Sequence, residues 1–74
     1  MPSRYPVVSG DRLIAALQRA GWIVTRHRGS HVRLRLGNRT VSVPSHSGRA
    51  IPIGTLAAIL DNAGLTPEQL REML

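Results

Sequence analysis

The sequence predicts an α+β fold with the element order α-β-β-β-α, in which helices cover one face of a three-stranded antiparallel sheet. A short extra helix is expected at the C-terminus. Apolar residues recur at helical spacing near both ends of the chain, residues 31–36 alternate between apolar and polar, and two glycine-containing dipeptides separate three β-type runs. With 74 residues and no cysteine, residues 1–74 are expected to form a single domain with one small core and no disulfide.

The first helix is predicted over residues 10–20, after an extended lead-in over residues 1–8 that contains two prolines. Ser9 is a suitable N-cap, and Asp11 places an acid in the first turn, where the helix dipole favours one. Gly21 stands where many helices end in a left-handed residue. The apolar stripe of this helix consists of Leu13, Ile14, Ala16, Leu17 and Ala20.

The first strand is predicted to start at Trp22 and to run to about Arg28, because its opening residues are aromatic or β-branched. The dipeptide Gly29-Ser30 suits a two-residue hairpin turn. Residues 31–36 then form a second strand, whose alternation puts two sets of side chains on opposite faces. The set predicted to face the core is Val32, Leu34 and Leu36, and the outward set is His31, Arg33 and Arg35.

The third strand is predicted from Arg39 to Val43, after the hairpin dipeptide Gly37-Asn38. Val41 and Val43 face the core, the residues between and before them face outward, and Pro44 ends the strand. An antiparallel meander of this kind buries one face, and the flanking helices are its natural cover.

A polar loop over residues 45–51 leads to a second helix, which starts after Pro52 and is closed by Gly64. The apolar positions of this helix are Leu56, Ile59, Leu60 and Ala63. The start signals of a short last helix are a Thr66 cap, Pro67, the capping-box residue Gln69, and a hydrophobic staple of Leu65 and Leu70.

The charge distribution predicts a polyanionic partner. The net charge is +6, and the chain has ten arginines and no lysine. Residues 12–60 contain no Asp or Glu, yet they hold eight arginines and all three histidines. Such a field attracts polyanions, and a guanidinium can donate two parallel hydrogen bonds to a phosphate. The alternative is a solvated basic face without a nucleic-acid role.

The segment from Arg26 to His31 holds the candidate chemistry. The hairpin turn delivers His31 to the start of a strand whose other outward-facing residues are arginines. Histidine ordinarily changes charge near neutral pH, so an imidazole there can move a proton at a bound phosphodiester. Gly29 permits close approach of a ligand to the backbone, and Ser30 can donate to phosphate. The alternative is a surface histidine beside an ordinary turn.

Of the other two histidines, His46 is a candidate site residue and His27 is not. His46, in the polar loop, is a candidate second proton-transfer group or phosphate ligand. The alternative is that it is a loop histidine without a functional role. His27 alternates away from its two arginine neighbours, and its facing is ambiguous. His27 and His31 flank a turn, and no carboxylate lies nearby in sequence. No metal site and no metal-dependent cleavage are therefore expected.

Two absences narrow the function classes further. Trp22 and Tyr5 are the only aromatic residues, so stacking platforms for bases are missing, and recognition should rest on phosphate and 2′-hydroxyl contacts with weak sequence preference. The longest uncharged stretch, residues 50–60, is too short to span a bilayer and is interrupted by Pro52 and Gly54. No membrane partner is expected, and the expected location is the cytoplasm.

Five motifs, taken in order, resemble those of HicA-type toxins, the small RNA-cleaving toxins of bacterial and archaeal toxin–antitoxin systems. They are Ser9-Gly10-Asp11, Ala20-Gly21-Trp22, Arg26 to Gly29-Ser30-His31, Val43-Pro44-x-His46, and Ile53-Gly54-Thr55-Leu56 through Ile59-Leu60 to Ala63-Gly64-Leu65. The resemblance extends from Ser9 to the C-terminus and implies a fold similar to a double-stranded-RNA-binding domain. Two departures are arginines where members often carry lysines, and Val32 where many have a second histidine or an aromatic residue.

The resemblance implies a ribosome-independent mRNA endonuclease that needs no cofactor, with His31 at the position of the catalytic histidine. It also implies a HicB-type antitoxin that covers the active face. The mechanism we expect is deprotonation of an RNA 2′-hydroxyl by His31, with His46 as the candidate acid for the leaving group. The candidate RNA-binding residues are Arg26, Arg28, Gly29, Ser30, Arg33, Arg35 and Arg49.

Two other interpretations stay open at the level of sequence. A non-catalytic RNA-binding module of the same fold would need the arginines but not the imidazole of His31. A protein-interaction module would use the basic face for an acidic partner and would show no RNA affinity even at low salt.

Overall fold

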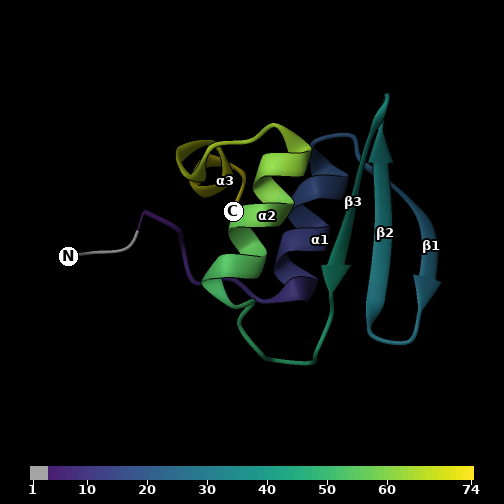
Figure 1. The fold of residues 1–74 in the computed structure, drawn as a ribbon, viewed down its shortest axis with the longest axis horizontal. Helices are drawn as coiled ribbons and strands as arrows, with labels where there is room; N and C mark the ends of the chain where they lie inside the picture. Colours follow the sequence, from purple (N-terminus) through teal and green to yellow (C-terminus); the bar gives the residue numbers. More distant parts are fainter. Residues whose placement is uncertain (1–3) are drawn as a thin grey trace.

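The computed structural model describes residues 4–74 and confirms the predicted α+β class and element order (Figure 1). The N-terminal part of the predicted extended lead-in, residues 1–3, lies outside the described residues. The elements are α1 (Gly10–Arg19), β1 (Ile23–Arg28), β2 (His31–Leu36), β3 (Arg39–Pro44), α2 (Ile53–Ala63) and α3 (Pro67–Met73).

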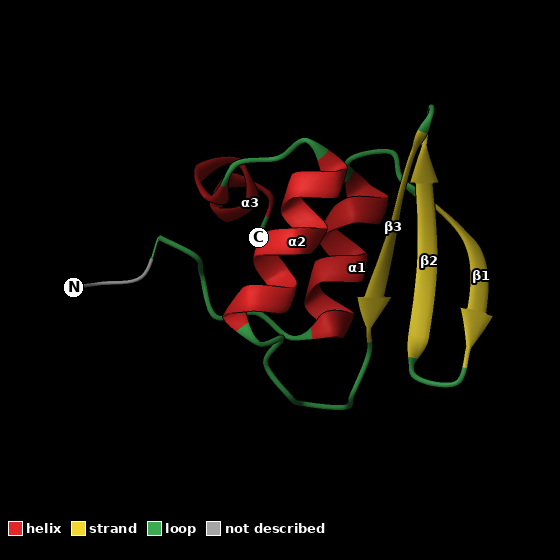
Figure 2. Ribbon diagram, in the orientation of Figure 1, coloured by secondary structure: helices red, strands yellow, loops and turns green. Residues whose placement is uncertain are grey.

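The three strands form one antiparallel sheet in the order β1-β2-β3. Both α1 and α2 contact β3, and α3 packs against α1. Figure 2 shows the helices gathered beside β3, with β1 as the strand farthest from them. This arrangement leaves β1 as an edge strand, and all but one of its six residues are exposed.

Helix α1 begins as the sequence predicts. The Ser9 hydroxyl accepts a hydrogen bond from the Arg12 backbone N–H at 3.2 Å, and Asp11 lies in the first turn. Leu13, Ala16 and Leu17 are buried, whereas Ile14 is half-buried. The other predicted member of the apolar stripe, Ala20, is exposed because it caps the end of the helix rather than lying within it.

Both predicted two-residue hairpins are present. Arg28 pairs with His31 across the first turn, and Leu36 pairs with Arg39 across the second. Gly29 has φ 57° and Gly37 has φ 61°, while no described non-glycine residue has a positive φ. A positive φ at the first central position alone is the pattern of the type II′ turn, whose twist matches that of the flanking strands.

Strand β1 contains a β-bulge that the pattern of its sequence does not predict. Val24 pairs with Leu34, but the next pair along is Arg26 with Arg33, so Thr25 is left over. The Thr25 hydroxyl donates to the Arg33 carbonyl oxygen at 3.4 Å. Because the extra residue resets the alternation, the residues after it lie one face away from where a regular strand would put them.

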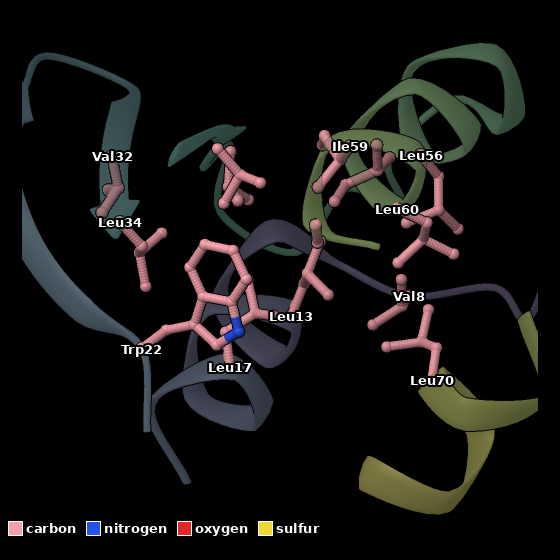
Figure 3. Packing of buried hydrophobic residues seen from close by; sticks show 14 residues of the cluster. Val8, Leu13, Leu17, Trp22, Val32, Leu34, Leu56, Ile59, Leu60 and Leu70 are labelled. Atoms are coloured by element: carbon pink, nitrogen blue, oxygen red, sulfur yellow. The ribbon is translucent and has the colours of Figure 1, made fainter. Parts of the chain in front are cut away.

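The core lies between the inner face of the sheet and the helices (Figure 3). Trp22 precedes β1 rather than starting it, and its side chain is buried in this core. The predicted core residue Leu36 differs from the expectation, since it is 43% exposed. Its neighbour on that side is Gly21, which has no side chain to cover it. The sheet residues that are buried are Val32, Leu34, Val41 and Val43.

The last two helices carry the caps that their sequences predict. Gly64 ends α2 in the left-handed conformation with φ 71°. At the start of α3, the Gln69 N–H donates to the Thr66 hydroxyl at 3.1 Å, and the Gln69 side-chain oxygen accepts from the Thr66 N–H at 2.8 Å. Leu70 is fully buried and joins α3 to the core. Among residues 4–74, no helix combines the length and the apolar character needed to cross a membrane.

Candidate functional site

The outer face of the sheet carries a cluster of exposed basic side chains. Directly paired residues of antiparallel strands point to the same face. Arg28 pairs with His31, and Arg26 pairs with Arg33 because of the bulge at Thr25. These four basic side chains therefore share the face opposite the core, and all four are exposed.

A depression of about 330 Å³ lies among these residues. We call it the arginine pocket, and its lining consists of Arg26, Arg28, His31, Arg33 and Ser42. Three guanidinium groups with no carboxylate in the lining give a site suited to a phosphate. Arg35 lies outside the pocket, farther along β2, where it pairs with Thr40.

A second depression, of about 430 Å³, lies between the end of β3 and the start of α2. We call it the loop pocket, and its polar lining consists of His31, Ser42, His46, Arg49 and Thr55. The rest of the lining is apolar and consists of Pro44, Ala50, Ile51 and Pro52. The two histidines predicted to transfer protons thus face one pocket, although they lie on different elements.

The loop that carries His46 and Arg49 is fastened at several points. At its start, the Ser45 N–H donates to the Ser30 carbonyl oxygen in the hairpin turn, and the Ser45 hydroxyl donates to Asp11 Oδ1. Within the loop, the Arg49 N–H donates to the His46 carbonyl oxygen at 2.9 Å. At its end, residues 50 and 51 pair with residues 8 and 9 in an antiparallel bridge. These contacts hold the loop against the hairpin turn, α1 and residues 8 and 9, and so define the shape of the loop pocket.

Not every predicted site residue lines a pocket. Gly29 and Ser30 form the turn before His31 and line neither pocket, and the Ser30 carbonyl oxygen is taken by Ser45. The ambiguous facing of His27 is resolved, because it pairs with Val32 and so lies on the helix side of the sheet. There it lines a separate hollow with Asp11.

Sequence reasoning did not select two polar residues of the site, Ser42 and Thr55. Ser42 borders both pockets. The two-residue turn at Gly37-Asn38 fixes the register that places Ser42 opposite Arg33, so this position was readable from the sequence. Thr55 enters the site only because α2 starts beside the loop, which no local pattern reveals.

The chemistry that this arrangement supports is anion binding with proton transfer. Neither pocket is lined by an Asp or Glu, and its ionisable side chains are histidine and arginine. Within residues 4–74, no three His, Cys, Asp or Glu side chains gather in a way that could hold a metal ion. His31 borders both pockets, so one imidazole faces a cluster of arginines on one side and a second imidazole on the other.

Comparison with known proteins gives one family match. The model of the family described as "HicA toxin of bacterial toxin-antitoxin" matches residues 10–65. The matched range is more than half of the chain and contains every residue that lines the arginine pocket and the loop pocket. A search of curated proteins found no match.

Proposed function

This chain belongs to the HicA toxin family and is the toxin of a toxin–antitoxin system, and on that premise we propose that it is a metal-independent endoribonuclease that cleaves mRNA. The observation that carries the proposal is the place of His31, which borders the arginine pocket and the loop pocket at once. A general base must lie within reach of the proton it takes while the phosphate is held beside it. The border between the two pockets meets both needs.

The reaction we propose is an internal transfer within RNA. His31 takes the proton of a ribose 2′-hydroxyl, and the resulting oxygen attacks the adjacent phosphorus. The bond from phosphorus to the 5′-oxygen of the next nucleotide breaks, and that oxygen receives a proton from the protonated imidazole of His46. The products are a 2′,3′-cyclic phosphate and a 5′-hydroxyl, so no water, metal ion or cofactor is consumed.

The arginines hold the substrate and stabilise the charge that develops on the phosphoryl oxygens. Arg26, Arg28 and Arg33 bind backbone phosphate in the arginine pocket, and Arg49 serves the loop pocket. Arg35 extends the basic face along β2. Gly29 and Ser30 contribute as the turn that positions His31, and their role toward RNA is indirect.

We also propose that the antitoxin is of the HicB type and covers the outer face of the sheet. This face presents exposed arginines on β1 and β2, and β1 is an uncovered edge strand. An acidic partner surface fits that charge, and it would exclude RNA because both ligands need the same guanidinium groups.

The experiment that tests the proposal maps the ends of cleaved RNA. Purified protein is incubated with an mRNA in EDTA, and in parallel with DNA of the same sequence. We expect cleavage of the RNA alone, with 2′,3′-cyclic phosphate and 5′-hydroxyl ends, because DNA lacks the attacking hydroxyl. Cleavage of DNA, or RNA products with 5′-phosphates, would refute the mechanism. RNA that is bound but stays intact would instead indicate the non-catalytic binding module.

An Arg33→Gln variant is expected to bind RNA more weakly and with a shallower dependence on salt. Arg33 lines the arginine pocket, and losing one phosphate contact lowers the slope of log K against log salt by about 0.7 to 0.9. The matched control is Arg39→Gln, which removes the same charge at the far end of β2–β3, where Arg39 Nη1 donates to the Asn62 carbonyl oxygen at 3.2 Å. If salt titrations gave both variants the same slope, Arg33 in the arginine pocket would contribute no more to RNA binding than Arg39 does.

A further inference from the structure

The two pockets that meet at His31 differ in their walls. Every side chain that lines the arginine pocket is polar or charged. The loop pocket also has four apolar lining residues, which we call its apolar wall, and one of them, Pro44, pairs directly with His31. The apolar wall consists of Pro44, Ala50, Ile51 and Pro52. The loop pocket's volume of about 430 Å³ falls in the range of about 300–1,000 Å³ that protein sites for small ligands have. Two adjoining sites of unlike chemistry suggest two unlike parts of one ligand.

A phosphate gains nothing from an apolar wall, whereas a nucleobase has flat apolar faces and a polar edge. The loop pocket offers a surface for each, since the hydroxyls of Ser42 and Thr55 and the guanidinium of Arg49 lie around the apolar wall. We propose that the loop pocket is a nucleobase subsite, which takes the base of the nucleotide whose 2′-hydroxyl lies at His31. This proposal rests on the proposed ribonuclease function and names the substrate class that it acts on.

The connection between the pockets sets the path of the RNA. His31 and Ser42 line both pockets, so the ribose sits at their border. The sugar–phosphate backbone then continues over Arg26, Arg28 and Arg33, while the base turns the other way, onto the prolines and Ile51. Hydrogen bonds from the loop to the hairpin turn and to residues 8 and 9 hold this pocket in shape before RNA arrives, which reduces the ordering cost of binding.

A base inside a duplex cannot enter this pocket, because it is stacked and paired. The substrate is therefore RNA with an unpaired nucleotide at the cleavage site, even though the fold carries no aromatic stacking platform. The pocket also provides base recognition that the phosphate-binding surface alone would not give. Hydrogen-bonding groups at its rim predict that cleavage favours some bases over others.

The test uses two RNAs of the same sequence around a mapped cleavage site. In the first RNA that segment lies in a hairpin loop, and in the second it is paired in a stem. We expect the loop RNA to be cleaved and the paired RNA to be cut at least roughly tenfold more slowly, because a paired and stacked base must leave the duplex before it can enter the loop pocket. Removing the base at successive positions should lower cleavage by a similar factor at one position only, on the 5′ side of the cut.

Protein variants locate the subsite. Ala50→Leu fills the apolar wall from an exposed position without adding a ring on which a base could stack. It should lower cleavage of the loop RNA at least roughly tenfold, because a displaced base misplaces the 2′-hydroxyl at His31, with little change in affinity for a short inorganic polyphosphate chain. Ala58→Leu, also exposed but outside the arginine pocket, the loop pocket and the hollow beside His27, is the matched control and should cleave normally.

The possible outcomes separate this proposal from the one it rests on. RNA cleavage that is equal in loop and stem, and that tolerates base removal at every position, would overturn the base subsite and leave the ribonuclease intact. Normal cleavage by Ala50→Leu would also overturn it. Failure of the wild-type protein to cleave any RNA would overturn the ribonuclease and, with it, the subsite.

Discussion

Replacing His31 with alanine is expected to slow RNA cleavage by about 10²- to 10⁴-fold, which is the usual contribution of a positioned general base. RNA affinity should change little, because Arg26, Arg28 and Arg33 still line the arginine pocket. Stability should also change little, since the His31 side chain is exposed at the start of β2 and contributes nothing to the core. Single-turnover cleavage and filter binding on the same RNA measure the two effects separately.

His27→Ala is a matched control for this experiment, because the chain loses the same side chain only four positions earlier. His27 lies on the helix side of the sheet and lines neither the arginine pocket nor the loop pocket, so its loss should leave cleavage unchanged. A His46→Ala variant should fall between the two if His46 supplies the leaving-group proton. If the His31→Ala variant cleaved RNA at the wild-type rate, His31 would not be the general base. The non-catalytic RNA-binding module would then be the better interpretation.

The sequence predicts the fold well where local patterns are strong. Residues 31–36 alternate without a break, and their buried and exposed faces follow that alternation up to Leu34. The caps at Ser9 and Thr66 are present with their hydrogen bonds. Helix boundaries agree closely because each is marked by a residue with a specific physical role, such as the left-handed Gly64 after α2.

The bulge at Thr25 shows where such patterns fail. In an unbroken strand, Arg26 would lie on the same face as Val24, toward the helices. The extra residue moves Arg26 to the outer face, opposite Arg33. Nothing in the composition of residues 23–28 marks which residue is left unpaired, because a bulge depends on how the partner strand is registered. The number of arginines on the outer face therefore had to come from the structure.

The approach of His46 to His31 could not be derived from spacing either. The two residues share a pocket because the loop is tied to the hairpin turn through Ser45 and Ser30, a contact between segments with no common periodicity. The apolar wall of the loop pocket is a second example. In the sequence, Ile51 ends the predicted polar loop and Pro52 precedes the predicted second helix, and only the packing shows that they line a cavity with two histidines.

A large loss of stability is expected from Gly10→Ala. Gly10 is buried at the start of α1, and a Cβ added there would lie 1.9 Å from the Pro44 carbonyl oxygen and 2.9 Å from Ser45 Cα. Both neighbours are backbone atoms, so neither can swing away as a side chain would. We expect a loss of about 3 kcal/mol in the free energy of unfolding. For a domain of this size, that corresponds to a fall in Tm of roughly 12–24 °C.

The control for this substitution is Gly54→Ala, which adds the same methyl group to the first turn of α2. A Cβ at Gly54 would meet nothing within 4 Å, and alanine is the better helix former, so stability should stay the same or rise by up to about 1 kcal/mol. Urea and thermal unfolding of both variants test this contrast. Equal stability of the two would mean that α1 can move away from the end of β3 at little cost.

The same clash has a functional consequence, since Pro44 lines the loop pocket and Ser45 ties the loop to the hairpin turn. Any shift that relieves the contact between α1 and Pro44 also displaces the segment that carries His46. Gly10→Ala should therefore lose cleavage at temperatures where it is still folded, whereas an equally destabilising core variant such as Leu70→Ala should keep it. Leu70 is fully buried on α3 and lines neither pocket, so its loss lowers stability, by about 2–5 kcal/mol, without moving the site. Retained cleavage by folded Gly10→Ala would show that the loop pocket does not depend on the start of α1.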